Sequence, residues 1–577
     1  MGIFNVAVTG LNAAQVGILT TSHNIANAST EGYNRQQIIQ STNTPMFTGA
    51  GYIGQGTNVL TVRRVYDQQL SEQVLAASTG AAEMDSYLTQ ISQIDNLLAD
   101  PSAGLSPALS GFFSAVQEMA ANPASIPARQ AMLSASQALV ARFQSIDQRM
   151  TEIRTGVNGM VTSEVTAINS YAQQIAEINQ RIILAQAAGP NQPPNDLLDQ
   201  RDQLIADLNT KIRATTITQS DGTYSVFIGN GQPLVVGTLP YSMKAVASPD
   251  DPERIVVALT SPTGNTVYMP ESMLSGGSLG GLIAFRSQSL DEAQNALGRI
   301  ALTFAQNFND QHQLGQDLDG DLGGDYFNMS LMGPMVRDNA NNTGTATIAA
   351  AIDTTNINDL TTSDYRLTYS AANTFSLTRL SDGQTWTGTG ASQAASFADL
   401  QTNLAADPQG FTLTFAGSAT LGDSFLIQPT RAGATNLALA ISNARDIAAA
   451  APIRSTAALA NTGTGSISAG IALDTTDPNL WTTTTLNFVA GGYQVNGAGP
   501  VIAYTPGANI DLNGWRVVVS GTPAAGDVFT IERNSAGVSD NRNAVLLGAL
   551  QTAPKMENGT ATYQSAYSTI VAQIGNK

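Results

Sequence analysis

Hydrophobic residues along much of the chain are spaced by three and four positions, which is the spacing of an amphipathic helix. Together with proline and glycine breakers, this spacing predicts helices over residues 67–98, 107–121 and 128–188, and a further helix that begins at Asn195. The third helix is the longest, and its hydrophobic stripe slips by one position near Met160, which predicts a local phase shift or bend. Helices of this length bury such stripes only against one another. The pattern therefore predicts a helical bundle.

Elsewhere the pattern changes to Val, Ile, Tyr and Thr alternating with polar residues, which is typical of strands. Residues 215–270 alternate in this way around turn signals at 221–222, 229–231 and 262–264. They predict a region of β-hairpins. Residues 276–327 then return to helical spacing.

A pair of strand patterns occurs twice in the second half of the chain. GFTLTFAG from Gly410, followed by GDSFLI from Gly422, is echoed by GWRVVVSG from Gly514 and GDVFTI from Gly526. Each pair predicts two strands joined by a glycine-rich turn, a hairpin, within one of two related β modules. The alanine-rich residues 437–451 predict a short helical connector between the modules.

Helical spacing returns at residues 540–550 and 561–574, so the chain is expected to re-enter the bundle near its end. The predicted fold class is multidomain α + β: a long-helix bundle, discontinuous in sequence and built from N- and C-terminal parts, with inserted, mainly β modules. The expected domains are an N-terminal axial helix and connector (1–62), the bundle with a β-hairpin region at about 215–270 (63–335 plus 536–577), a first β module (336–436), a helical connector (437–465) and a second β module (466–535).

The N-terminal helix has a narrow hydrophobic seam and almost no charge. Two sets of residues recur every seven positions with the a/d spacing of a coiled coil: Phe4, Leu11, Ile18 and Ile25, and, three places further on, Ala7, Ala14, Thr21 and Ala28. From Ile3 to Ala28 the only side chain that could be charged is His23. The seam is too narrow to bury the helix in a globular core, and no Lys or Arg holds it on lipid. We expect Phe4, Leu11, Ile18 and Ile25 to form an assembly seam for partner helices; an ordinary amphipathic core helix is the alternative.

Composition narrows the possible chemistry. The 577-residue chain has 44 acidic and 26 basic residues, and its net charge of −18 repels nucleic acid and anionic membranes. It has no cysteine and only two histidines, His23 and His312, which excludes disulfides, thiolate catalysis and Cys- or His-rich metal sites. No apolar run reaches the ~18 residues of a membrane span, and no basic segment typical of a cleaved secretion signal precedes Arg35. We expect no nucleic-acid partner, no membrane insertion, no cofactor and no metal.

Some motifs resemble ligand or catalytic sites but lack what such sites need. Residues 49–54 spell GxGxxG, but a strand pattern follows where a dinucleotide fingerprint requires a helix. The aspartates within 317–325 lack the glycine and glutamate of an EF-hand, because Leu322 and Asn328 stand at those positions, so a solvated turn is expected. No nucleophile pattern surrounds His312, which we expect to be a hydrogen-bonded core or interface histidine. We therefore expect no enzyme; an enzyme or sugar-binding module is the alternative.

The N-terminal residues also carry a family signature. LNAAQ (11–15) followed by TSHNIANASTEGYNRQ (21–36) resembles the N-terminal motif of the flagellar rod, hook and hook-associated axial proteins. The chain departs from this family at His23, where Asn is usual, and at Glu31, where Pro is frequent. The resemblance implies secretion through the flagellar type III apparatus by an uncleaved N-terminal segment. It also implies a turn motif that contacts neighbouring subunits, formed by Asn24, Asn27, Gly32, Tyr33 and Arg35.

Two later stretches resemble the hook-associated protein 1 family: GYIGQGTNVLTVRRVYDQQL (51–70), and residues 276–327, which contain GGLIAFR (280–286). The second stretch resembles this family more closely than hook protein or flagellin. This resemblance implies a structural adaptor at the hook-filament junction. Its implied partners are copies of itself, hook protein, the second junction protein and an export chaperone. Another flagellar axial protein, a hook or distal-rod protein, is the alternative. The family continues into a longer C-terminal helix with an SGVN-type motif, whereas this sequence stops at Lys577, so we expect either a truncated chain or an atypical member.

Overall fold

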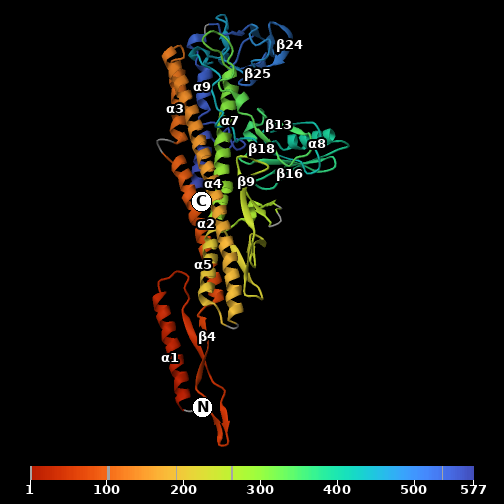
Figure 1. Cartoon of the computed structure of the whole chain (residues 1–577). Helices are drawn as coiled ribbons and strands as arrows, with labels where there is room; N and C mark the ends of the chain where they lie inside the picture. The colour runs from red at the N-terminus through yellow and green to blue at the C-terminus, as the bar shows by residue number, and fades with distance from the viewer. Residues whose placement is uncertain (1–2, 101–103, 190–191, 262–263, 265, 536) are drawn as a thin grey trace. The chain divides into compact units, whose positions relative to one another are not determined.

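The computed structural model describes residues 3–100, 104–189, 192–261, 264, 266–535 and 537–577. Within it the chain divides into two compact units, each assembled from separate segments. Figure 1 labels the helices and strands and colours them from red at the N-terminus to blue at the C-terminus. The first unit contains residues 1–93 and 153–289, and the second contains residues 94–152 and 290–577. Two long helices, α2 (Gln68–Leu98) and α4 (Ile126–Ala188), contribute residues to both units. The chain is thus a multidomain protein of mixed α and β structure, as the sequence predicted.

The helices of the first unit confirm the predicted spacing. Besides parts of α2 and α4, this unit contains α1 (Ile3–Ala26), α5 (Asn195–Lys211) and α6 (Gly277–Phe285). The buried positions of α4 advance by four residues three times in succession, from Ile153 through Val157 and Val161 to Val165. This is the predicted phase shift, because a seven-residue repeat alternates steps of three and four.

The predicted β-hairpins of residues 215–270 form two antiparallel sheets, and the first unit also contains an N-terminal ladder that was not predicted. One sheet has the order β5-β6-β7-β8 and the other the order β11-β10-β9. Their strands are β5 (Ala214–Thr218), β6 (Tyr224–Ile228), β7 (Gln232–Val236), β8 (Leu239–Pro240), β9 (Ser242–Ala247), β10 (Ile255–Thr260) and β11 (Thr266–Tyr268). Of the turn predicted at 262–264, residues 262 and 263 lie outside the described part of the chain. The ladder pairs β1 (Gln36–Thr42) with β4 (Thr57–Arg64), and between them β2 (Met46–Thr48) pairs with β3 (Gly51–Ile53).

The helical core of the second unit is aromatic. It joins α3 (Leu105–Ala121), α7 (Asp291–Gln313), α9 (Arg542–Ala549) and α10 (Tyr563–Asn576) to the first half of α4. Phe304 lies at its centre, with its ring edge-on to Phe112 and to Tyr563, at centroid distances of 5.4 Å in both cases. Aromatic pairs favour this edge-to-face geometry. The contact with Tyr563 confirms that the chain returns to the bundle after its β modules.

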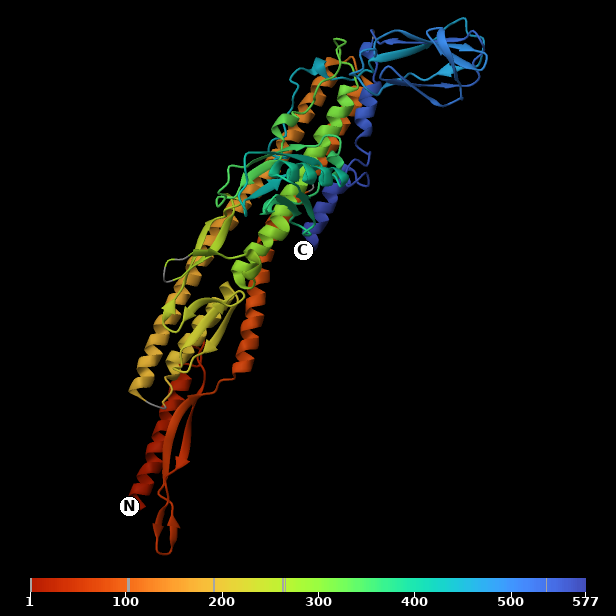
Figure 2. The same ribbon diagram turned by 90° about the vertical axis from the view of Figure 1, so that its right-hand side faces the viewer.

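The two β modules in the second unit are each built around a five-stranded sheet. Figure 2 shows their strands in green to teal for the first module and in blue for the second. Each has a five-stranded antiparallel sheet, of order β12-β18-β14-β15-β16 in the first module and β19-β27-β22-β23-β24 in the second. The first module adds the pair β13-β17 and the helix α8 (Gln393–Ala406), which was not predicted; in the second, β26 pairs with β20, β21 and β25. The strands of the first module are β12 (Met335–Asp338), β13 (Thr347–Ile352), β14 (Tyr365–Ala371), β15 (Thr374–Arg379), β16 (Thr385–Thr389), β17 (Phe411–Ala416) and β18 (Ser424–Gln428). Those of the second are β19 (Ile453–Ala457), β20 (Ser466–Ile467), β21 (Ile471–Ala472), β22 (Thr484–Val489), β23 (Gly492–Val495), β24 (Ala498–Ala503), β25 (Asn509–Leu512), β26 (Trp515–Ser520) and β27 (Val528–Arg533).

The repeated strand pair is not a hairpin, which corrects the prediction. β17 and β18 lie in different sheets, as do their counterparts β26 and β27. Where the chain passes from one sheet to the other, the aspartate of the Gly-Asp dipeptide accepts hydrogen bonds from three backbone N–H groups. Asp423 accepts them from Thr343, Gly344 and Thr420, at 2.9, 3.1 and 2.7 Å. Asp527 accepts from the equivalent positions Thr462, Gly463 and Ala524, at 2.8, 3.1 and 2.8 Å. This carboxylate ties the crossing to a distant segment, so the two strands separate instead of pairing.

The predicted helical connector is also wrong. Residues 437–451 contain a single 3₁₀ turn, Ala444–Asp446, and are otherwise irregular, with isolated β-bridges at Leu439 and Ala450. The backbone of Ala448–Ala450 is buried and finds tertiary partners, among them the side chain of Asn543, which donates to the Ala448 carbonyl at 2.7 Å. These partners replace the hydrogen bonds that a helix would have supplied. The five-part domain division stays a prediction.

Candidate assembly surface of the N-terminal segment

Helix α1 has two different faces. One face packs on the β1-β4 ladder: Ala13 is 3% exposed, and the Thr9 hydroxyl accepts a hydrogen bond from the Thr57 N–H at 3.3 Å. The opposite face carries the predicted seam. Its four residues are exposed, at 85% for Phe4, 68% for Leu11, 68% for Ile18 and 72% for Ile25. At 100° per residue the seam lies across the helix from Ala13, and no strand among the described residues covers it.

The turn after α1 is held by a small polar network. The Asn24 amide pairs with the backbone of Gln36, donating to its carbonyl and accepting from its N–H, both at 2.8 Å. The Tyr33 hydroxyl donates to the same Asn24 oxygen at 2.7 Å and lies 3.1 Å from His23 Nδ1. Asn27 donates to the His23 carbonyl at 3.1 Å. The end of the helix is thereby fastened to the first residue of β1.

Gly32 occupies a position that only glycine tolerates. Its φ of +77° lies in the left-handed region, and a Cβ there would lie 2.7 Å from the side-chain oxygen of Gln203 on α5. The turn therefore approaches α5 closely at this residue.

Helix α5 clamps the turn and the ladder through its acidic face. Asp199, which is 5% exposed, accepts from the Asn34 N–H at 3.0 Å and from Arg64 Nη1 at 2.8 Å. The same Arg64 nitrogen lies 2.6 Å from Asp202. About one helical turn before Asp199, the side chain of Asp196 accepts a hydrogen bond from the Gln36 side-chain amide at 2.7 Å. Segments far apart in the sequence thus meet at one ion-paired junction.

Burial and charge oppose each other at this junction. Burial acts to lower the pKa of Arg64, but Asp202 and Asp199 outweigh it and raise that pKa above its usual value. For Asp202, burial raises the pKa despite the nearby Arg64. The pKa of Tyr33 is also raised, by burial and then by Asp196 and Asp199. A buried pair of this kind contributes little net stability, but removing one partner leaves an uncompensated charge.

Of the predicted turn residues, four meet at this junction and one does not. Asn24, Asn27, Gly32 and Tyr33 take part as described above. The side chain of Arg35 is exposed, and its backbone carbonyl accepts a hydrogen bond from the Val65 N–H at 2.7 Å. Any residue at this position could accept that hydrogen bond. The contacts of these residues with other subunits stay a prediction.

Sequence reasoning missed the partners on α5. Asp196, Asp199 and Asp202 recur every three residues and thus share a helix face. This acidic helix face and the basic pair Arg63–Arg64 were the features of the sequence from which an ion-paired contact could have been predicted.

The remaining candidate motifs have structural roles. His312 is fully buried: its Nδ1 lies 2.8 Å from the Gly324 carbonyl, and its Nε2 accepts from the Ala448 N–H at 2.9 Å. This confirms a core histidine. In the aspartate loop, Asp317 accepts from the N–H groups of Asp319 and Asp321, which confirms the turn. The described part of the chain brings together no group of three His, Asp or Glu residues that could hold a metal ion.

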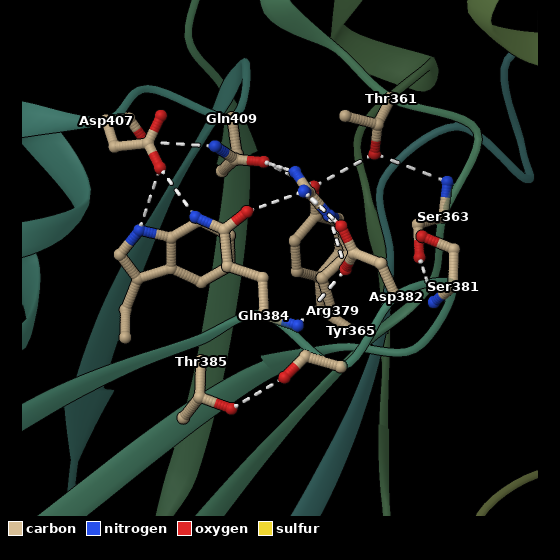
Figure 3. Close-up of polar contacts among 12 residues, drawn as sticks. Thr361, Ser363, Tyr365, Arg379, Ser381, Asp382, Gln384, Thr385, Asp407 and Gln409 are labelled. Atoms are coloured by element: carbon tan, nitrogen blue, oxygen red, sulfur yellow. Dashed lines mark hydrogen bonds and ion pairs between the residues drawn. The ribbon is translucent and has the colours of Figure 1, made fainter.

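A polar network in the first β module surrounds Arg379 (Figure 3). Arg379 donates to Asp382, to Gln384 and, at 2.9 Å, to Gln409. The hydrogen bonds that Asp382 accepts from Arg379 and then from the Gln384 N–H lower its pKa to about 2. Asp407 accepts from Trp386 Nε1 at 3.2 Å. The polar groups of this network are hydrogen-bonded to one another and fasten the β15-β16 turn to the segment after α8. The network therefore has a structural role.

In the described residues, no helix combines the length and hydrophobicity that a membrane crossing requires. The structure defines a class: a multidomain protein with long helices, two β modules and an N-terminal helix that exposes one hydrophobic face.

Comparison with known proteins identifies the family. Three family models match: "Flagellar hook-associated protein FlgK helical domain" at residues 91–327, "Flagellar hook-associated protein 1, D2-like domain" at 337–429 and "Flagella basal body rod protein" at 4–34. The flagellar hook-associated protein 1 of Salmonella typhimurium is 36% identical over 450 residues, 78% of each chain. That of Escherichia coli K12 is 35% identical over 448 residues, covering 78% of this chain and 79% of the relative.

A solved structure agrees. The flagellar hook junction protein FlgK from Burkholderia pseudomallei matches with a TM-score of 0.77 and 35% identity, covering 87% of this chain and 95% of that one. The chain belongs to the flagellar hook-associated protein 1 family and is a component of the flagellum. The matches to the helical and D2-like domains favour this family over the hook or distal-rod alternative.

Proposed function

We propose that this protein is a structural adaptor at the hook-filament junction, assembled through its terminal helices. The observation that carries the proposal is the open seam of α1. An uncharged helix that exposes Phe4, Leu11, Ile18 and Ile25, while its other face is fixed to its own chain, is suited to pack against helices of neighbouring subunits. The partners we propose are copies of the chain, hook protein and the second junction protein.

Export through the flagellar type III apparatus, with the help of a chaperone, belongs to the same proposal. The support is chemical. A chain without cysteine cannot form disulfides that would block passage of the unfolded polypeptide. An exposed hydrophobic seam also needs protection before assembly, which is the task we propose for the chaperone.

The test replaces two seam residues with aspartate in the only genomic copy, Leu11→Asp with Ile18→Asp. Two buried charges in a helix-helix seam disrupt packing, so we expect loss of swimming and of attached filaments, with the variant protein still found in the medium. The matched control is Asn5→Asp with Asn12→Asp, which adds two charges to exposed positions of the same helix away from the seam. Normal swimming of the Leu11/Ile18 variant would remove the role of the seam.

A further inference from the structure

The β1-β4 ladder has one face that is turned toward helix α5. The Asn34 side chain, just before β1, donates to Asp199 of α5 at 2.8 Å. Gln36 donates to Asp196 of the same helix at 2.7 Å. Arg64, which pairs with Gln36 across the ladder, also binds Asp199, at 2.8 Å. Because successive side chains of extended backbone point to opposite faces, the residues that alternate with these point away from α5.

The other face of the ladder carries Arg35 and Arg63, and we call it the basic face. Arg35 stands between Asn34 and Gln36 in the sequence. Arg63 pairs with Gln37 across the ladder and therefore shares the face of Arg35. Both arginine side chains are exposed, and within the described part of the chain neither has a hydrogen bond or an ion pair. In a chain of 26 basic and 44 acidic residues, these two cations are available to a partner.

Helices α4 and α5 and the turn after α1 surround a cleft of about 560 Å³ at the same junction, on the side of α5; we call it the acidic cleft. Its lining contains four carboxylates, those of Glu31, Glu177, Asp196 and Asp199. The basic side chains in the lining are His23 and Arg181. The cleft is therefore net negative even when both of these are charged.

Three of the four carboxylates have room for a further donor. Glu31 is exposed and has no partner among the described residues. Glu177 is exposed and accepts one hydrogen bond, from a glutamine of its own helix. The side chain of Asp196 is 62% exposed, and its second oxygen lies 3.7 Å from His23 Nε2. Since an ionised carboxylate offers about four acceptor sites, each of these groups can still bind a guanidinium.

A second copy of this chain fits both surfaces. Carboxylates match the planar fork of an arginine, which binds them through two parallel hydrogen bonds. Nucleic acid and anionic lipid do not fit, because two arginines leave most of the net charge of −18 uncompensated. The basic face points away from α5, whereas the acidic cleft lies beside α5. One copy can therefore use its basic face toward one neighbour and its acidic cleft toward the next.

We propose that the basic face of one copy docks into the acidic cleft of its neighbour. The contact joins two different surfaces, so it repeats from copy to copy and produces a ring or a helical array. Charged contacts of this kind contribute more to orientation and to the rejection of wrong partners than to affinity. We therefore assign to this contact the register between neighbours. The inference rests on the proposed function, because it requires copies side by side in the flagellum, and it deepens that function by naming the groups that meet.

Cross-linking at the basic face tests the contact. Cells carry the chain with Arg63→Lys as their only copy, and isolated flagella are treated with a carbodiimide, which joins an amine to a carboxylate in direct contact. We expect a ladder of dimers and larger multimers, in which mass spectrometry finds the new amine joined to Glu31, Glu177 or Asp196. The matched control, Arg213→Lys, gains the same amine at another exposed arginine of the same unit and should give at least tenfold fewer multimers. A link within one chain adds no mass, so it does not imitate the ladder.

An exchange of charges tests the same contact without a reagent. Arg35→Glu with Arg63→Glu places carboxylates against the acidic cleft, so we expect at least tenfold fewer attached filaments. Glu31→Arg with Glu177→Arg, added to the same chain, restores opposite charges and should bring the filaments back. All four positions are exposed and lie outside the clamp made by α5, so the exchange leaves the fold intact. Unchanged filament numbers in the first variant, or no recovery in the second, overturn the contact.

The outcomes separate this inference from the proposed function. Flagella that contain the Arg63→Lys variant but show no more multimers than the control overturn the contact and leave the junction role intact. Products that stop at dimers, or that join the new amine to a different protein, also overturn it, because the proposed contact repeats between copies of this chain. Absence of even the unmodified protein from isolated flagella overturns the junction role itself.

Discussion

The buried ring of His312 makes the stability of the second unit depend on pH. The ring is fully buried, and burial lowers its pKa to about 4 from the usual 6.5. The Gly324 hydrogen bond and Asp325 act in the opposite direction, while Arg129 adds to the lowering. In the folded protein the ring is neutral, because Nε2 must accept the Ala448 N–H.

The sign of the effect follows from proton binding. Between pH 6.5 and pH 4 the unfolded chain binds a proton at this histidine and the folded chain does not. The stabilisation is therefore complete above pH 6.5 and is lost as the pH falls toward 4. A difference of 2.5 pKa units corresponds to about 3 kcal/mol in total, of which about 2 kcal/mol is lost between pH 7.5 and pH 5.

The measurement is urea unfolding at pH 7.5 and pH 5, followed by circular dichroism at 222 nm, for the unmodified chain and for His312→Gln. Comparing the two proteins cancels the titration of every other group, so the stability advantage of the histidine over glutamine should shrink by about 2 kcal/mol at pH 5. His23→Gln is the control for removing a histidine that is not buried. For this variant the difference from the unmodified chain should not shrink by about 2 kcal/mol at pH 5. Because the chain has two histidines, selective ¹³C labelling gives two resonances. A His312 resonance that titrates near pH 6.5 in the folded protein would refute the reasoning.

Four further substitutions test local features. Gly32→Ala places a Cβ on a left-handed residue beside α5 and should cost roughly 1–2 kcal/mol, seen as faster hydrogen exchange of the turn; unchanged exchange contradicts the tight fit. Asp423→Ala leaves three backbone N–H groups of the first module without their acceptor and should destabilise it by roughly 2–4 kcal/mol in urea; an unchanged midpoint contradicts the anchor. Gly298→Ala puts a methyl group into the Thr430 carbonyl and should lower stability by roughly 1–3 kcal/mol. Gly156→Ala is the matched control, because a Cβ at Gly156 has no atom within 4 Å, and it should raise stability by about 1 kcal/mol. Equal effects of the two glycine substitutions on stability would contradict the close contact between Gly298 and Thr430.

Local patterns predicted the helices and most strands well, because they depend on periodicity. The shift of the α4 stripe near Met160 was visible in the spacing of its own residues. The free face of α1 also followed from the sequence, since a narrow uncharged seam cannot be buried by one chain alone. The clamp formed by Asp199 and Arg64 could not be predicted in the same way, because it joins residues that are 135 positions apart.

The errors share a physical cause: tertiary partners replaced local ones. Residues 437–451 have strong helical propensity, yet their backbone groups bond to Asn543, His312 and Gln316. Propensity is a weak preference that such contacts readily override. Likewise, adjacent strands joined by a short glycine turn usually pair, but the carboxylate of Asp423 redirects the chain.

The two equivalent aspartates have a consequence for the evolution of such chains. Asp423 and Asp527 fix the passage between sheets by binding main-chain groups, and these are present whatever the neighbouring side chains. Substitutions and insertions nearby can therefore accumulate without altering the route of the backbone. The two modules already illustrate this freedom, since one acquired a covering helix and the other an extra strand at the corresponding stage of the chain.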